Sequence, residues 1–81
     1  MKIELTPTAK KQLKKMPKSE VKKIARKLFS LQSSPYSGKK LEGKLKDRFV
    51  MRAWPYRIIY VIIHNSIIQV DTIEHRQGVY K

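Results

Sequence analysis

The spacing of apolar residues changes near the middle of this chain, from a helical period to a strand period. Before residue 46, apolar side chains recur every three or four positions, which is typical of amphipathic helices. From residue 48 to residue 74 they alternate with polar residues or form β-branched runs, which is typical of strands. A run of helices followed by a run of strands indicates an α+β domain.

Two helices are expected in the first half. Thr6-Pro7 has the form of a helix start, an N-cap followed by proline at the first helical position. Two apolar stripes follow, separated by Pro17, and they predict a helical hairpin or a sharply kinked pair. The stripes consist of Ala9, Leu13 and Met16, and of Val21, Ile24, Ala25, Leu28 and Leu31. Turn residues at 33–38 end the second helix, and 41–46 is a basic connector.

Four strands are expected, at residues 1–5, 48–53, 56–64 and 67–74. The first is an edge or first strand, and 56–64 is apolar on both faces, as in a central strand. Turns are expected at Trp54-Pro55 and Asn65-Ser66. The order β-α-α-β-β-β predicts an N-terminal strand, a helical hairpin and a three-stranded antiparallel meander, with the helices on one face. At 81 residues, the chain is expected to be one domain, 1–81.

The charge is strongly unbalanced. The chain contains 19 Lys and Arg residues but only six Asp and Glu residues, which gives a net charge of +13. Nucleic acid, an anionic membrane or an acidic protein would each suit such a surface, and we favour RNA bound through its phosphates. The lysines lie mainly in residues 1–46, whereas four of the five arginines lie in 47–81. Lysine suits non-specific attraction, while the guanidinium fork grips phosphate at two points.

Three arginines are candidates for a common site. Arg52 and Arg57 flank the expected Trp54-Pro55 turn, and Arg76 follows the last strand, near Tyr80. The ends of these elements converge on one side of a meander, so we expect a site there. For Arg48, taken alone, a solvated or salt-bridged surface position is the better interpretation.

Several kinds of chemistry lack the residues they need. The chain has no cysteine, its two histidines are eleven positions apart, its carboxylates are scattered, and it has no glycine-rich phosphate loop. We therefore expect no metal and no cofactor. No apolar run approaches the roughly 20 residues of a membrane span, so we expect a cytoplasmic protein without a membrane partner.

Catalysis on RNA remains feasible with such residues. The 2′-hydroxyl can attack the adjacent phosphate if one group assists its deprotonation and cations stabilise the developing charge. Arginines would supply the charge, and Tyr80 or His75 would contribute proton transfer or base stacking.

Three segments, in order, are similar to the RelE/ParE superfamily of bacterial and archaeal toxins. They are Leu41-Glu42-Gly43-Lys44-Leu45, Tyr56-Arg57-Ile58-Ile59-Tyr60 and His75-Arg76-Gln77-Gly78-Val79-Tyr80. The resemblance covers nearly the whole chain. It implies a RelE-like fold and, for RelE-like members, a ribosome-dependent endoribonuclease that cuts mRNA and is neutralised by an antitoxin.

The resemblance also implies roles for single residues. Arg57 would bind phosphate, Arg76 would be the C-terminal catalytic arginine, and Tyr80 would stack on the target nucleotide. Arg52 would be the second of two basic residues on its strand, the first being replaced here by Val50. Possible replacements for that missing group are Lys46, Arg48 and His75.

Three functions stay open at this point. The first is an mRNA endoribonuclease toxin whose candidate catalytic residues are Arg52, Arg57, Arg76, Tyr80 and His75. Its candidate RNA-binding residues are Lys44, Lys46 and Arg48, and its partners would be the ribosome, mRNA and a cognate antitoxin. The second is a ParE-like inhibitor of DNA gyrase, and the third is a non-catalytic RNA-binding homologue.

Overall fold

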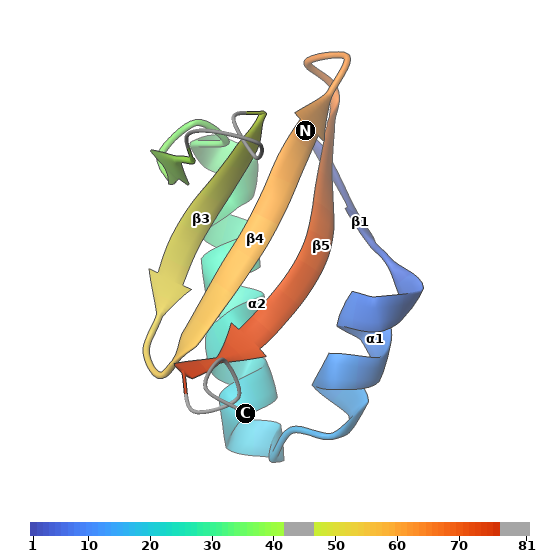
Figure 1. Cartoon of the computed structure of the whole chain (residues 1–81), viewed down its shortest axis with the longest axis vertical. Coiled ribbons are helices and arrows are strands. Elements are labelled where there is room, and N and C mark those ends of the chain that lie inside the picture. Colours follow the sequence, from blue (N-terminus) through green and yellow to red (C-terminus); the bar gives the residue numbers. More distant parts are fainter. Residues whose placement is uncertain (42–46, 77–81) are drawn as a thin grey trace.

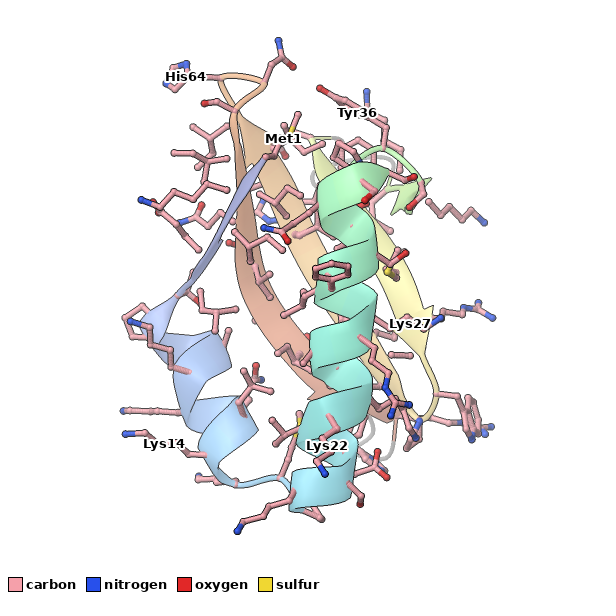
Figure 2. All side chains as sticks on the ribbon, turned by 180° about the vertical axis from the view of Figure 1, so that it is seen from behind. Met1, Lys14, Lys22, Lys27, Tyr36 and His64 are labelled. Atoms are coloured by element: carbon pink, nitrogen blue, oxygen red, sulfur yellow. The ribbon has the colours of Figure 1, made fainter. Side chains whose placement is uncertain are left out.

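A computed structural model describes residues 1–41 and 47–76 of the chain. It shows one mixed sheet with two helices packed against one of its faces (Figures 1 and 2). The elements are β1 (Lys2–Leu5), α1 (Pro7–Lys14), α2 (Lys18–Ser33), β2 (Lys39–Lys40), β3 (Arg48–Ala53), β4 (Tyr56–Ile63) and β5 (Ile67–His75). The predicted α+β class, the two helices and the final meander are confirmed.

The described sheet has five strands, one more than the four predicted from the sequence, and the N-terminal strand lies at its edge. Its order is β1-β5-β4-β3-β2, so β4 is the central strand, as expected. β1 pairs in parallel with β5, and the two-residue β2 pairs antiparallel with β3. The strand β2 was not predicted, because two exposed lysines carry no apolar alternation.

Local sequence explains where the first helix begins. The Thr6 hydroxyl accepts a hydrogen bond from the amide of Ala9 at 3.1 Å, and Pro7 occupies the first turn. Both features are favoured at a helix start. The Thr6 hydroxyl also donates to the carbonyl oxygen of Asp71 at 2.6 Å. The residue that caps α1 therefore also ties the helix to β5.

The core lies between the helices and the inner face of the sheet. Alternation along β4 buries Tyr56, Ile58 and Tyr60, while α2 contributes Ile24 and Leu31. Apolar burial of this kind contributes about 25 cal/mol per Å². It therefore fixes which face of each strand is turned toward the helices, and neither helix lies on the other face of the sheet.

A β-bulge interrupts this alternation in β5. Val70 pairs with Tyr60 and Thr72 pairs with Ile59, so Asp71 is an extra residue between them. Val70 and Ile73 are consequently both buried, although they are three positions apart. Every side chain after the bulge lies on the opposite face from the one that uninterrupted alternation would give it.

Candidate nucleic-acid interface

Arg52 and Arg57 form the centre of the candidate site. They are directly opposite one another in the β3–β4 register, next to the turn that joins the two strands. Their neighbours Ala53 and Tyr56 are buried toward the helices, so the two arginine side chains lie on the face of the sheet that carries neither helix. Both side chains are exposed. The like charges of Arg52 and Arg57 repel one another across the strands, while Glu74 of β5 is directly opposite Arg57 on its other side.

Arg76 joins this pair from the end of β5. Its backbone amide donates a hydrogen bond to the carbonyl oxygen of Pro55 at 2.8 Å. Its guanidinium carbon lies 4.8 Å from the centre of the Trp54 ring, within the range of a cation–π contact. The end of β5 and the β3–β4 turn therefore meet, as Figure 1 shows at the lower end of the sheet.

These groups surround a cavity of about 240 Å³. It is lined by Arg52, Trp54, Pro55, Tyr56, Arg57 and Arg76. Within residues 1–41 and 47–76, no carboxylate lies within 4.0 Å of any of the three arginines. The structure therefore brings Arg52, Arg57 and Arg76 together around the Trp54-Pro55 turn, which is the grouping expected from the sequence.

The turn itself is tied to the helical layer. The Lys23 ammonium of α2 donates to the carbonyl oxygen of Trp54 at 2.9 Å and lies 3.2 Å from a carboxylate oxygen of Glu20. One side of the turn is therefore held by α2 and the other by Arg76. The sequence suggested neither contact, because Lys23 is 31 positions from Trp54.

His75 lies on the other face of the sheet. Its ring packs edge-on against Tyr56, with the ring centres 5.1 Å apart. It lines a separate cavity of about 300 Å³ beside α1, together with Gln12, Lys15, Met16, Pro17, Tyr56 and Ile73. The bulge at Asp71 is the cause, because it moves His75 from the arginine face to the helix face. Its proposed role in proton transfer stays a prediction.

Arg48 is on the arginine face but is held in ion pairs. Its Nε donates to Oδ2 of Asp71 at 2.8 Å, and its guanidinium lies 3.6 Å from Asp47. The hydrogen bond and the charge of Asp71 raise the pKa of Arg48 above its ordinary value. This agrees with the salt-bridged surface position that the sequence favoured. The proposed RNA-binding residues Lys44 and Lys46, and the proposed stacking residue Tyr80, lie outside the described residues.

Two further properties bear on the chemistry. In the described part of the chain, no group of three or more His, Asp or Glu side chains is placed to hold a metal ion. No helix there is long and apolar enough to cross a membrane.

The sequence as a whole matches a known family. The family model described as "ParE toxin of type II toxin-antitoxin system, parDE" matches residues 3–80. The chain belongs to this ParE toxin family. The RelE/ParE resemblance seen in the sequence is thereby confirmed. The comparison with curated proteins gives no match.

Several solved structures similar to this ParE-family toxin are toxin–antitoxin complexes, and others are toxins alone. The RelBE2 complex of Mycobacterium tuberculosis has a TM-score of 0.84 at 27% identity, over 93% of this chain and 96% of the matched chain. The archaeal RelE–RelB complex of Pyrococcus horikoshii has a TM-score of 0.78 at 22% identity, over 93% of both chains. A YoeB–YefM complex of Staphylococcus aureus has a TM-score of 0.77 at 23% identity, over 93% and 95%. This chain is therefore a toxin of the type II toxin–antitoxin family ParE, and it shares its fold with RelE and YoeB toxins.

Proposed function

We propose that this ParE-family toxin is an endoribonuclease that cuts mRNA on the ribosome and so inhibits translation. The observation that carries the proposal is the cavity at which Arg52, Arg57 and Arg76 meet, with no carboxylate of the described residues within 4.0 Å of their guanidinium groups. Guanidinium groups are planar forks whose geometry matches phosphate oxygens. Three of them around one cavity suit a phosphate that gains negative charge during a reaction.

The proposed reaction is a transfer within the RNA. The 2′-oxygen forms a bond to the adjacent phosphorus while the bond to the 5′-oxygen breaks, and the proton of the 2′-hydroxyl passes to a base. A proton is returned to the leaving 5′-oxygen, so the products are a 2′,3′-cyclic phosphate and a 5′-hydroxyl. Arg52, Arg57 and Arg76 would stabilise the pentacovalent phosphorus. The residues themselves would supply this stabilisation, without metal or cofactor.

The remaining site residues keep the roles expected from the sequence. Tyr80 would stack on the target nucleotide, and Tyr80 or His75 would move a proton. His75 would first have to approach from the helix face. Lys44, Lys46 and Arg48 would bind RNA phosphates, with Arg48 contributing least because Asp71 neutralises much of its charge. The lysine-rich helices, with Lys14 and Lys22 on the side away from the sheet in Figure 2, would attract ribosomal RNA.

We also propose that a cognate antitoxin neutralises the toxin. The similar structures from Mycobacterium tuberculosis, Pyrococcus horikoshii and Staphylococcus aureus are toxin–antitoxin complexes. A net charge of +13 favours an acidic or amphipathic partner. The protein would act in the cytoplasm, where ribosomes and mRNA are found.

Inhibition of DNA gyrase is the second candidate. The matched family model is that of the ParE toxin. Gyrase inhibition is the function expected of a ParE-like toxin. Such a binder needs no phosphoryl-transfer site, so three arginines around one cavity, which make no ion pair with another described residue, favour RNA cleavage over it. A supercoiling assay with purified gyrase and stoichiometric toxin separates the two, because only a gyrase inhibitor blocks supercoiling.

Primer extension on mRNA from induced cells tests the proposal. The intact toxin should produce discrete cuts within translated frames, whereas Arg57→Ala and Arg76→Ala should produce none and should not arrest growth. Lys22→Ala is the matched control, because it also removes one positive charge, from the outer side of α2. Full toxicity in both arginine variants, or growth arrest without any cut in mRNA, would contradict the assignment.

A further inference from the structure

A second hollow adjoins the three-arginine cavity. It has a volume of about 430 Å³ and is lined by Ser37, Gly38, Lys39, Val50, Met51 and Arg52. Arg52 lines both hollows, so they adjoin one another at this residue. None of the roles assigned above uses the second hollow beside β2.

The register of β2 places one cation in this hollow. Lys39 is directly opposite Val50, and Val50 lies on the same face of β3 as Arg52. Residues that are directly opposite in a sheet share a face, so Lys39 lies on the arginine face. Lys40 is opposite Phe49 and belongs to the other face. Strand rise and strand spacing put the Cα atoms of Lys39 and Arg52 about 8 Å apart.

The hollow offers positive charge without a competing carboxylate. Within residues 1–41 and 47–76, no carboxylate lies within 4.0 Å of Lys39 or Arg52. Val50, which lies between them in the register of the arginine face, carries no charge. Arg48, two residues before Val50 on the same strand, is by contrast paired with Asp71. Among the described residues, Arg48 thus has carboxylate partners, whereas Lys39 has none.

The segment that carries Lys39 is anchored to the core. The buried Tyr60 hydroxyl donates to the carbonyl oxygen of Pro35 at 2.9 Å and accepts a hydrogen bond from the amide of Gly38 at 3.1 Å. A Cβ on Gly38 would collide with that hydroxyl. Only glycine therefore fits at this close approach of the backbone. The wall of the hollow is preformed rather than assembled around a ligand.

We propose that Lys39, beside Arg52, forms a phosphate subsite for the RNA nucleotide next to the one held at the three-arginine cavity. The inference rests on the proposed function, because the phosphate held in the three-arginine cavity is the one that reacts. A spacing of about 8 Å between the two cationic positions suits successive phosphates of an extended strand. Lysine suits a positioning subsite, since it offers a mobile point charge, whereas the arginine forks remain with the reacting phosphate. A groove of positive charge that follows the backbone is the usual way to hold single-stranded RNA.

The test measures binding apart from cleavage. The probe is a fluorescent single-stranded RNA with a 2′-deoxy group at the target nucleotide, which cannot be cut, and anisotropy is read over a range of salt concentrations. Lys39→Ala should weaken binding about tenfold, as for loss of a hydrogen bond to a charged group. It should also reduce the slope of log affinity against log salt by about 0.7. Lys40→Ala, on the neighbouring residue but on the other face, should change neither.

A second variant controls for loss of local structure. Val50→Lys places an ammonium directly opposite position 39, so combining it with Lys39→Ala should restore most of the affinity. Equal affinities of Lys39→Ala and Lys40→Ala, or no binding of the probe by the intact toxin, would overturn the subsite. If Lys39→Ala weakened binding of a poly-glutamate peptide but not of RNA, the surface would be a protein-docking site, and the inference would again fail. RNA binding that depends on Lys39, in a toxin that makes no cut, would reject the nuclease and keep the subsite.

Discussion

The guanidinium carbon of Arg76 lies 4.8 Å from the centre of the Trp54 ring. Trp54 is 66% exposed, so its ring contributes little to the core. Its contact instead holds the last described arginine over the β3–β4 turn, beside Arg52 and Arg57. Loss of the Trp54 ring should therefore lower activity rather than stability.

Replacing Trp54 by alanine tests this relationship. A cation–π contact at an exposed site is worth about 0.5–1 kcal/mol, so Trp54→Ala should lower RNA cleavage about fivefold through misplacement of Arg76. Its midpoint of urea unfolding should hardly move, and Trp54→Phe, which keeps a ring, should lose less activity. If the unfolding midpoint fell in proportion to activity, Trp54 would be a structural residue instead.

The pairing of Arg52 with Arg57 predicts opposite effects on activity and stability. Arg52→Gln removes a like-charge contact directly across the strands, which should raise the free energy of unfolding by about 0.5 kcal/mol. It should nevertheless abolish most RNA cleavage. Urea unfolding in low and in high salt checks the first effect, because screening at 1 M salt should remove the gain. A loss of stability in low salt would mean that the two charges do not repel as the register implies.

The Arg48–Asp71 ion pair spans β3 and β5 across the central strand. Asp71→Asn should release the Arg48 guanidinium and so strengthen RNA binding, with a modest loss of thermal stability. Arg48→Ala should weaken binding less than Arg52→Ala does, because its charge is already compensated. Anisotropy with the uncleavable RNA measures all three variants. Equal losses from Arg48→Ala and Arg52→Ala would show that the ion pair opens when RNA binds.

Tyr60 gives a prediction for the dependence of stability on pH. Burial raises the pKa of its hydroxyl above the ordinary value, and the hydrogen bond from the Gly38 amide opposes the shift. The neutral form is thus favoured in the folded state. The contribution to stability is complete below about pH 10, the ordinary tyrosine pKa. It is lost above that pH, as ionisation comes to favour the unfolded chain.

Tyr60→Phe isolates this effect. At neutral pH it should cost about 1–2 kcal/mol, because the Pro35 carbonyl and the Gly38 amide lose their partner. The difference from the unaltered protein should shrink as the pH rises from 9 to 11, since only the latter loses stability through Tyr60. Urea unfolding at a series of pH values measures the gap. A constant gap would contradict the predicted direction of the shift.

Much of the fold could be predicted because its signals are local. The cap at Thr6, the break at Pro17 and the alternation in 48–53 depend on residues that are adjacent or one turn apart. The bounds of β3 agree with the predicted strand, and the turn before Ile67 contains Asn65 with φ of 54°, a conformation that asparagine tolerates. The strand β2 was missed, because its partner β3 rather than its own composition makes it a strand.

The site was predicted only in part. Sequence by itself determined that Arg52 and Arg57 flank a turn and that Arg76 follows the last strand, because local residue patterns mark where the strands end. It also determined that Arg48, Val50 and Arg52 share a face of β3, because side chains alternate along a strand. Tertiary structure alone decided that Arg76 meets Trp54, that Asp71 neutralises Arg48, and that Lys39 lies opposite Val50. It also decided the side of His75, since a single bulge residue reverses alternation and no local pattern marks it. These four features have a common physical reason. Strand register and charge pairing depend on which segments of the chain lie side by side, and burial of the shared core decides that.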